Sequence, residues 1–150
     1  MGITGDDPLE HNGNYGLYGV MDQKVYRFYD SDESNGISVF LRLVGNPADR
    51  NQIHFYTDTG VVFTGIFEGR PKDIFGIGFV YTGISKDAAQ FDKDSGAANI
   101  RSYESLLELC YSLELMSGWT LQPNAKYIWN PGGTDTSNAL VLGLRSTMTF

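Results

Sequence analysis

The last twelve residues of the chain, 139–150, read ALVLGLRSTMTF and alternate between two kinds of side chain. The even-numbered positions are mostly apolar and end on Met148 and Phe150, whereas the odd-numbered positions include Arg145 and two threonines. A period of two places these two sets on opposite faces of an extended chain, because successive side chains of a strand point in opposite directions. The segment therefore predicts a β-strand with one apolar and one polar face.

Similar alternation upstream predicts further strands over 37–45, 52–66, 74–85 and 120–130. Residues 16–29 are rich in Tyr and Gly but alternate poorly, because Asp22, Gln23 and Lys24 interrupt both faces. That region is expected to form one long strand or two short ones.

The segment 102–116, SYESLLELCYSLELM, is compatible with two structures. Its leucines and glutamates favour a helix by propensity. A strand, however, separates the polar and apolar residues better, because it places Glu104, Glu108 and Glu114 on one face. We predict a strand here, which gives seven in all.

The connections between these strands are of unequal length. Shorter turns are expected at 30–36, 46–50, 67–73 and 117–118, with a longer loop at 131–138 and a long polar loop at 86–101.

The predicted strands are long for a soluble protein, in which strands usually have ~5–6 residues. A strand of 12 residues rises roughly 40 Å, and at a tilt of ~45° it crosses about 28 Å, enough for the ~25 Å apolar band of an outer-membrane barrel. Bacterial barrels begin at about eight strands and use even numbers. Seven strands therefore predict an incomplete barrel, with residues 1–150 as part of a single domain.

Composition excludes several other classes of protein. The net charge is −7 with 11 Lys and Arg in 150 residues, which argues against a nucleic-acid-binding surface. The apolar runs are too short for a transmembrane helix. The single cysteine, Cys110, cannot form an internal disulfide, and we predict neither a metal site nor a cofactor. No secretory signal precedes Asp22, so either the protein stays in the cytoplasm or its true N-terminus is missing.

Several stretches of the sequence resemble one family. The C-terminal segments LQPNAKYIWNPGG (121–133) and NALVLGLRSTMTF (138–150) are similar to the end of the carbohydrate-selective porins of the OprB type. The stretches GDDPLEHNGNYGLYGVMDQ (5–23), NPADRNQIHFY (46–56) and GRPKDIFGIGFVY (69–81) resemble the same family in the same order.

The resemblance implies an all-β fold, in which this chain supplies the C-terminal seven or so antiparallel strands of a transmembrane barrel of roughly sixteen. It also implies passive diffusion of glucose-like mono- and short oligosaccharides across the bacterial outer membrane, without enzymatic activity. Phe150, with Met148, Leu144 and Leu142 at alternate positions before it, resembles the signal recognised by the barrel-assembly machinery, although Ser146 departs from that pattern. Expected partners are sugars, outer-membrane lipid, the remainder of the barrel and further copies in a homotrimer.

Polar residues on the expected lumen face are candidates for contact with sugar. They are Arg42, His54, Asp58, Glu104, Glu108, Glu114, Gln122, Asn124, Lys126 and Arg145. Opposed charges on Arg42, Arg145, Glu104 and Glu108 would create a transverse field at a constriction. The alternative is that each residue simply adds polarity to a water-filled wall.

The aromatic residues at the predicted strand ends have two interpretations. They are expected to form interfacial girdles at the membrane surface, or else platforms for sugar rings. The residues concerned are Tyr103, Trp119, Tyr127, Trp129 and Phe150.

If Phe150 lies at the periplasmic rim, the segments 131–138, 86–101 and 46–50 are extracellular, and 117–118, 67–73 and 30–36 are periplasmic. The main alternative to a porin is a soluble all-β module that binds a sugar or an apolar ligand. A β-rich glycosidase is a third possibility, but two carboxylates four residues apart on a strand lie roughly 13 Å from each other, too far for a catalytic pair.

Overall fold

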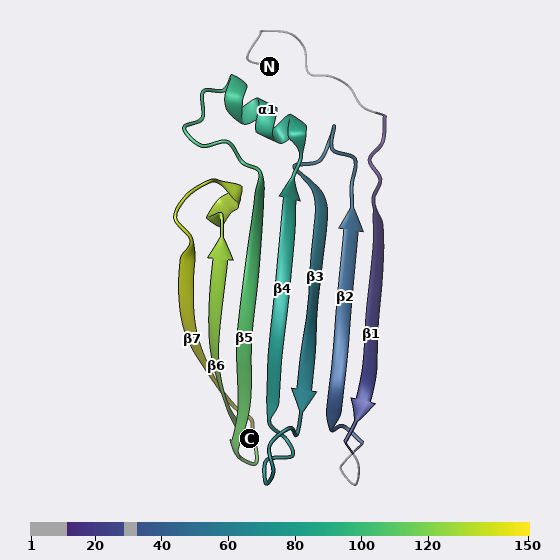
Figure 1. Ribbon diagram of the computed structural model, residues 1–150, viewed down its shortest axis with the longest axis vertical. Coiled ribbons are helices and arrows are strands. Elements are labelled where there is room, and N and C mark those ends of the chain that lie inside the picture. Colours follow the sequence, from purple (N-terminus) through teal and green to yellow (C-terminus); the bar gives the residue numbers. More distant parts are fainter. Residues whose placement is uncertain (1–11, 29–32) are drawn as a thin grey trace.

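The computed structural model describes residues 12–28 and 33–150, which form one antiparallel sheet in which neighbouring strands in the sequence are neighbours in space (Figure 1). The strands are β1 (Leu17–Arg27), β2 (Gly36–Gly45), β3 (Ile53–Thr64), β4 (Ile74–Ile84), β5 (Tyr103–Met116), β6 (Trp119–Trp129) and β7 (Ala139–Met148). At ~3.3 Å per residue, the 10 to 14 residues of each strand extend over about 33–46 Å.

The seven predicted strands are confirmed, with ends that differ by a few residues. The region 16–29 contributes a single strand, β1, and 102–116 forms β5 rather than a helix. Leu109 of β5 pairs with Ile77 of β4 and Ala125 of β6. Pairing on both sides satisfies the backbone of β5, and this outweighs the helix propensity of its residues. Of the turn expected at 30–36, residues 30–32 lie outside the described residues, as do residues 5–11 of the first segment with family resemblance.

The prediction of a loop throughout 86–101 is wrong, because its first part is the helix α1 (Lys86–Asp94). The hydroxyl of Ser85 caps the helix by accepting a hydrogen bond of 3.2 Å from the amide of Ala88. Asp87 and Lys93 lie in the first and last turns, where their charges complement the helix dipole. The described part of the chain contains no helix with the length and apolar character needed to cross a bilayer.

The two ends of the sheet differ in their connections. Figure 1 shows α1 and the connection that contains it at one end, which we call the loop end; it also carries 46–52 and 130–138. The opposite end, the turn end, carries 65–73, the two-residue turn 117–118 and the C-terminus of the chain. Segment 130–138 includes the short 3-10 helix η1 (Pro131–Gly133).

The sheet is one layer thick. Its buried side chains are polar and its large apolar residues are at least partly exposed, the reverse of the pattern in a soluble domain. Across residues 12–28 and 33–150, no hydrophobic side chain is buried. The buried polar residues of this part are Asn35, Asp58, Asp73, Ser85, Asp92 and Ser105. Leu142 is 74% exposed, although it lies within a regular strand. An exposed apolar surface of this extent indicates contact with another apolar phase or partner.

Both edges of the described sheet are open. Within this part of the chain, β1 pairs with β2 and β7 pairs with β6, so each has one free edge. Every residue of β1 is exposed. Free strand edges expose unpaired amides and carbonyls, and they form pairs with further strands wherever these are available.

Candidate functional site

The strand register assigns each side chain to one of two faces, because directly paired residues lie on the same side of a sheet. Arg42 of β2 is paired with Asp58 of β3, and Glu108 of β5 with Lys126 of β6. Neighbouring pairs connect these residues into one surface, the polar face. The opposite side, the apolar face, carries exposed leucines at alternate positions of β7, namely Leu140, Leu142 and Leu144.

Two pairs of opposite charges lie on the polar face. Arg42 donates from Nε to Oδ1 of Asp58 at 2.9 Å, and the hydroxyl of Tyr56 donates to Oδ2 of the same carboxylate at 2.9 Å. Lys126 Nζ lies 3.6 Å from Glu108 Oε1. The face therefore offers hydrogen-bonding groups to a solute, and opposite charges offset each other at these two pairs.

Nine of the ten residues predicted to line a lumen lie on the polar face: Arg42, Asp58, Glu104, Glu108, Glu114, Gln122, Asn124, Lys126 and Arg145. The four-residue charge constellation considered above is not assembled as a unit. Arg42 binds Asp58 and Glu108 binds Lys126, whereas Glu104 accepts a hydrogen bond of 2.6 Å from the amide of Gly132. Other positions are held by neutral contacts, such as the 2.7 Å contact from Gln122 Nε2 to Cys110 Sγ.

The prediction that His54 shares the face of Asp58 is wrong. The register of β3 against β4 shifts between Ile53 and Phe55, so His54 lies at an irregularity of the strand. Its ring atom Cε1 lies 2.8 Å from the position that a Cβ on Gly83 would take, and Gly83 is paired with Phe55 on the apolar face. An extra residue in one strand changes the direction of the side chain at that position, so the odd–even rule no longer predicts its face.

Comparison with known proteins identifies the origin of this arrangement. The model of the family described as carbohydrate-selective porin, OprB family, matches residues 2–150. The chain belongs to the carbohydrate-selective porin family. Porin B of Pseudomonas aeruginosa is 31% identical over 163 residues, covering 100% of this chain. The solved structure titled high pH structure of Pseudomonas putida OprB superposes with a TM-score of 0.84 over 93% of this chain at 29% identity. The chain spans about a third, 36%, of the length of each of these two porins.

The apolar face of this porin chain carries an aromatic band at the loop end. Tyr103, the first residue of β5, stacks on Tyr81 with ring centroids 5.6 Å apart. Trp129, the last residue of β6, meets Tyr127 edge to face at 4.8 Å. Phe55 extends the band, with its centroid 6.3 Å from that of Tyr81.

A second aromatic band lies on the same face at the turn end, and most of it was not predicted. Phe63 stacks on Phe75 at 5.9 Å, and Phe67 meets Tyr111 edge to face at 5.8 Å. The predicted residue Trp119 is also at this end and donates to Ser146 Oγ at 3.0 Å. On β3, the eight residue steps from Phe55 to Phe63 separate the two bands by roughly 26 Å along the strand. Pairing between strands reveals the band, whereas the sequence shows only scattered aromatic residues.

A buried carboxylate secures the turn end of the porin sheet. Asp73 is 2% exposed and accepts hydrogen bonds from the side chain of Arg70, the hydroxyl of Tyr111 at 2.7 Å and the amide of Glu114 at 3.0 Å. Burial raises the pKa of Asp73, but the hydrogen bonds outweigh it, and the pKa is lowered overall. This network joins the β3–β4 turn to β5. Nearby, Lys72 pairs with Glu114 at 3.0 Å.

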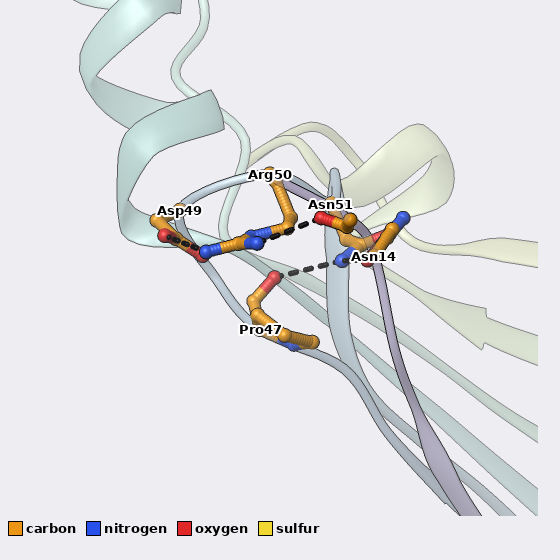
Figure 2. Close-up of polar contacts among 6 residues, drawn as sticks. Asn14, Pro47, Asp49, Arg50 and Asn51 are labelled. Carbon is orange, nitrogen blue, oxygen red and sulfur yellow. Dashed lines mark hydrogen bonds and ion pairs between the residues drawn. The ribbon is translucent and has the colours of Figure 1, made fainter. Parts of the chain in front are cut away.

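Polar contacts also order the loop end, where Figure 2 shows residues before β1 held against the β2–β3 connection. Asn14 and Asn51 exchange two hydrogen bonds of 2.9 Å through their side-chain amides. Asn51 also donates to the carbonyl of Pro47 at 3.0 Å, and Arg50 pairs with Asp49 at 2.8 Å. A cavity of about 400 Å³ lies between this connection and α1.

Helix α1 is fixed to the residues before β5 by an ion pair. Asp92 is 6% exposed and accepts from Arg101 Nη2 at 2.6 Å, from its Nε at 2.8 Å and from its backbone amide at 3.1 Å. These hydrogen bonds lower the pKa of Asp92 by more than burial raises it. The connection at 86–101 is thus an ordered segment, a helix held by an ion pair, rather than a free loop.

Proposed function

We propose that these seven strands form part of the wall of a closed outer-membrane barrel that admits sugars by passive diffusion. The observation that carries the proposal is the single-layer sheet with an exposed apolar face on one side and an ordered polar face on the other. Backbone groups in lipid must all be paired, so a sheet that faces hydrocarbon has to close on itself. The two open edges of the described sheet are the places where the remaining strands of such a barrel would pair.

The aromatic bands support placement of the apolar face in lipid. Their separation of roughly 26 Å along β3 corresponds to about 18 Å across the bilayer at a tilt of ~45°, so the bands lie towards the two margins of the ~25 Å apolar band of outer-membrane barrels. Tyr and Trp favour the boundary between hydrocarbon and headgroups, because each combines an apolar ring with a polar atom. Tyr103, Trp119, Tyr127, Trp129 and Phe150 act as interfacial residues in this proposal, rather than as sugar platforms.

The polar face suits neutral solutes. Because Arg42 and Lys126 are each matched by a carboxylate, a sugar meets donors and acceptors without a strong field of one sign. Weak contacts with these groups bias passage, and no covalent step is required. The glycosidase alternative loses support because Glu104 and Glu108 lie four residues apart on a regular strand.

The orientation of the barrel follows from its connections. Outer-membrane barrels have short periplasmic turns and longer extracellular loops. The loop end, with α1 and η1, therefore faces outwards, and the turn end with Phe150 faces the periplasm. In this arrangement Phe150 is available to the barrel-assembly machinery, and the apolar face also offers a surface for homotrimer formation.

Reconstitution in a planar bilayer tests the proposal. The barrel assembled from these strands and the remaining ones should conduct ions in steps, and added glucose should reduce the current. The 150-residue chain alone, with two open edges, should not conduct. A chain that stays monomeric in buffer without detergent, or an assembled barrel that never conducts, would favour the soluble sugar-binding module instead.

A further inference from the structure

The polar face contains a hollow where glycines replace side chains. One row of paired residues runs from Phe40 on β2 through Gly60 and Gly78 to Glu108 on β5. Hollows of about 160 and 170 Å³ lie along this row, and Phe40, Gly78 and Glu108 line both of them. Together they fall at the lower end of the ~300–1,000 Å³ range of small-molecule sites.

One wall of the hollow is the ring of Phe40, which leans over Gly60. Its Cε1 and Cζ lie 2.6 and 2.7 Å from the position that a Cβ on Gly60 would take. Any larger residue at position 60 would displace the ring. The guanidinium carbon of Arg42 lies over this ring at 5.9 Å from the ring centroid, a cation–π contact that helps to hold the ring in place.

The floor of the hollow is open. A Cβ on Gly76 would meet no atom within 4 Å, and a Cβ on Gly78 would meet only the carbonyl oxygen of Thr59 at 4.0 Å. The space above these two glycines is therefore vacant, in contrast to the space above Gly60. Neither glycine has a positive φ, so their backbone conformation does not explain why side chains are absent.

The charged groups around the floor have hydrogen-bonding capacity that their present contacts do not use. Glu108 lies 3.6 Å from Lys126, which is too long for a hydrogen bond, so both groups can bind a hydroxyl without breaking one. The Arg42 side chain is 57% exposed beside its bond to Asp58. Each charge has an opposite partner, so a ligand with a net charge of either sign would meet repulsion as well as attraction.

We propose that this hollow is a binding subsite for one neutral pyranose ring on the pore wall. The C–H face of the sugar packs on Phe40 above Gly76 and Gly78, and its hydroxyls bond to Glu108 and Arg42. An apolar surface with a few directed polar groups is the general pattern of small-ligand sites. The proposal rests on the proposed function, since the sugar reaches the subsite through the lumen.

Three variants of the assembled barrel test the subsite, with glucose block of single-channel current in a planar bilayer as the readout. Gly78→Val fills the floor with a β-branched residue that suits a strand. Phe40→Leu removes the aromatic face without narrowing the pore. Gly19→Val is the matched control, because a Cβ on Gly19 also meets no atom within 4 Å, but this residue pairs with Leu43 on the apolar face.

The half-blocking concentration of glucose should rise at least about 10-fold in Gly78→Val, since a filled site excludes the ring. It should rise about 2- to 10-fold in Phe40→Leu, the range expected for loss of one aromatic contact, and stay unchanged in Gly19→Val. Glucose block of the parent barrel with no change in either test variant would overturn the subsite and leave the proposed function intact. A parent barrel that glucose does not block would instead refute the proposed function. If Gly78→Val fails to assemble, Phe40→Leu decides.

Discussion

Replacement of Asp73 by alanine should destabilise the barrel more than any single change to an exposed ion pair. The carboxylate is 2% exposed and accepts from Arg70, Tyr111 and the amide of Glu114. Alanine leaves the hydroxyl of Tyr111 and the amide of Glu114 without their acceptor, and Arg70 keeps only its hydrogen bond to the carbonyl of Glu114. Each buried unpaired donor costs about 1–3 kcal/mol, and loss of one member of a buried pair costs about 3–5 kcal/mol. Because Arg70 can turn to solvent, we expect a total near the lower figure, about 3 kcal/mol.

Urea unfolding of the folded barrel in detergent micelles, followed by tryptophan fluorescence, measures this loss. The matched control is Glu33→Ala, which removes the pair of Glu33 with Arg27, whose side chains are 92% and 55% exposed. That change should cost less than about 0.5 kcal/mol. A loss below about 1 kcal/mol for Asp73→Ala would refute the reasoning, because the three donors would then have found other partners.

The same variant has a defined dependence on pH. Since the pKa of Asp73 is lowered in the folded state, its contribution to stability is fully present above the unfolded value of ~3.9. The contribution decreases once the pH falls below the unfolded pKa, and it is lost when the pH has fallen through the lower pKa of the folded state. The stability difference between the parent and Asp73→Ala should therefore shrink in acid and remain constant between about pH 5 and 8. A difference that grew on acidification would contradict this assignment.

Three further predictions concern the loop end, the polar face and the apolar face. Asp92→Asn should accelerate hydrogen exchange in α1, because the pair with Arg101 is lost, and unchanged exchange would contradict the pairing. Since the pKa of Asp92 is lowered in the folded state, the parent should behave like this variant only after the pH has fallen through that lowered pKa. Glu108→Gln leaves Lys126 unmatched and should shift the reversal potential in a KCl gradient towards anion selectivity; no shift would place the pair outside the conduction path. Leu144→Arg should cost about 2–4 kcal/mol of barrel stability if residue 144 faces lipid, whereas a loss near zero would place it in water.

The positions of the strands and their two faces could be predicted from the sequence because the sheet has a single layer. In such a sheet, the environment of each residue depends almost entirely on whether its position is odd or even within the strand. The segment 102–116 was ambiguous because the local propensity of its residues favours a helix. It forms β5 because β4 and β6 pair with it on both sides, and these neighbours are not visible in the local sequence.

The features that were missed depend on partners distant in sequence. His54 was assigned to the wrong face because the register of β3 against β4 shifts at this residue, and the sequence of β3 alone does not show the shift. Phe40 is one of several apolar residues on the polar face, and its role depends on Gly60 and Gly78, which only the pairing brings beside it. Helix α1 is the exception: Ser85 before an acidic first turn is a recognisable cap, and the local signal could have found it.

The central claim is that alternate residues of one strand face lipid and water, and spin labels along β7 test it most directly. Single cysteines are introduced at 140–145 in a Cys110→Ser background, labelled with a nitroxide and examined in the barrel reconstituted in lipid. Labels at 140, 142 and 144 should collide mainly with oxygen, and those at 141, 143 and 145 mainly with a water-soluble nickel complex. Equal accessibility at all six positions, or protection of the even-numbered set from both reagents as in a dry protein interior, would contradict the account.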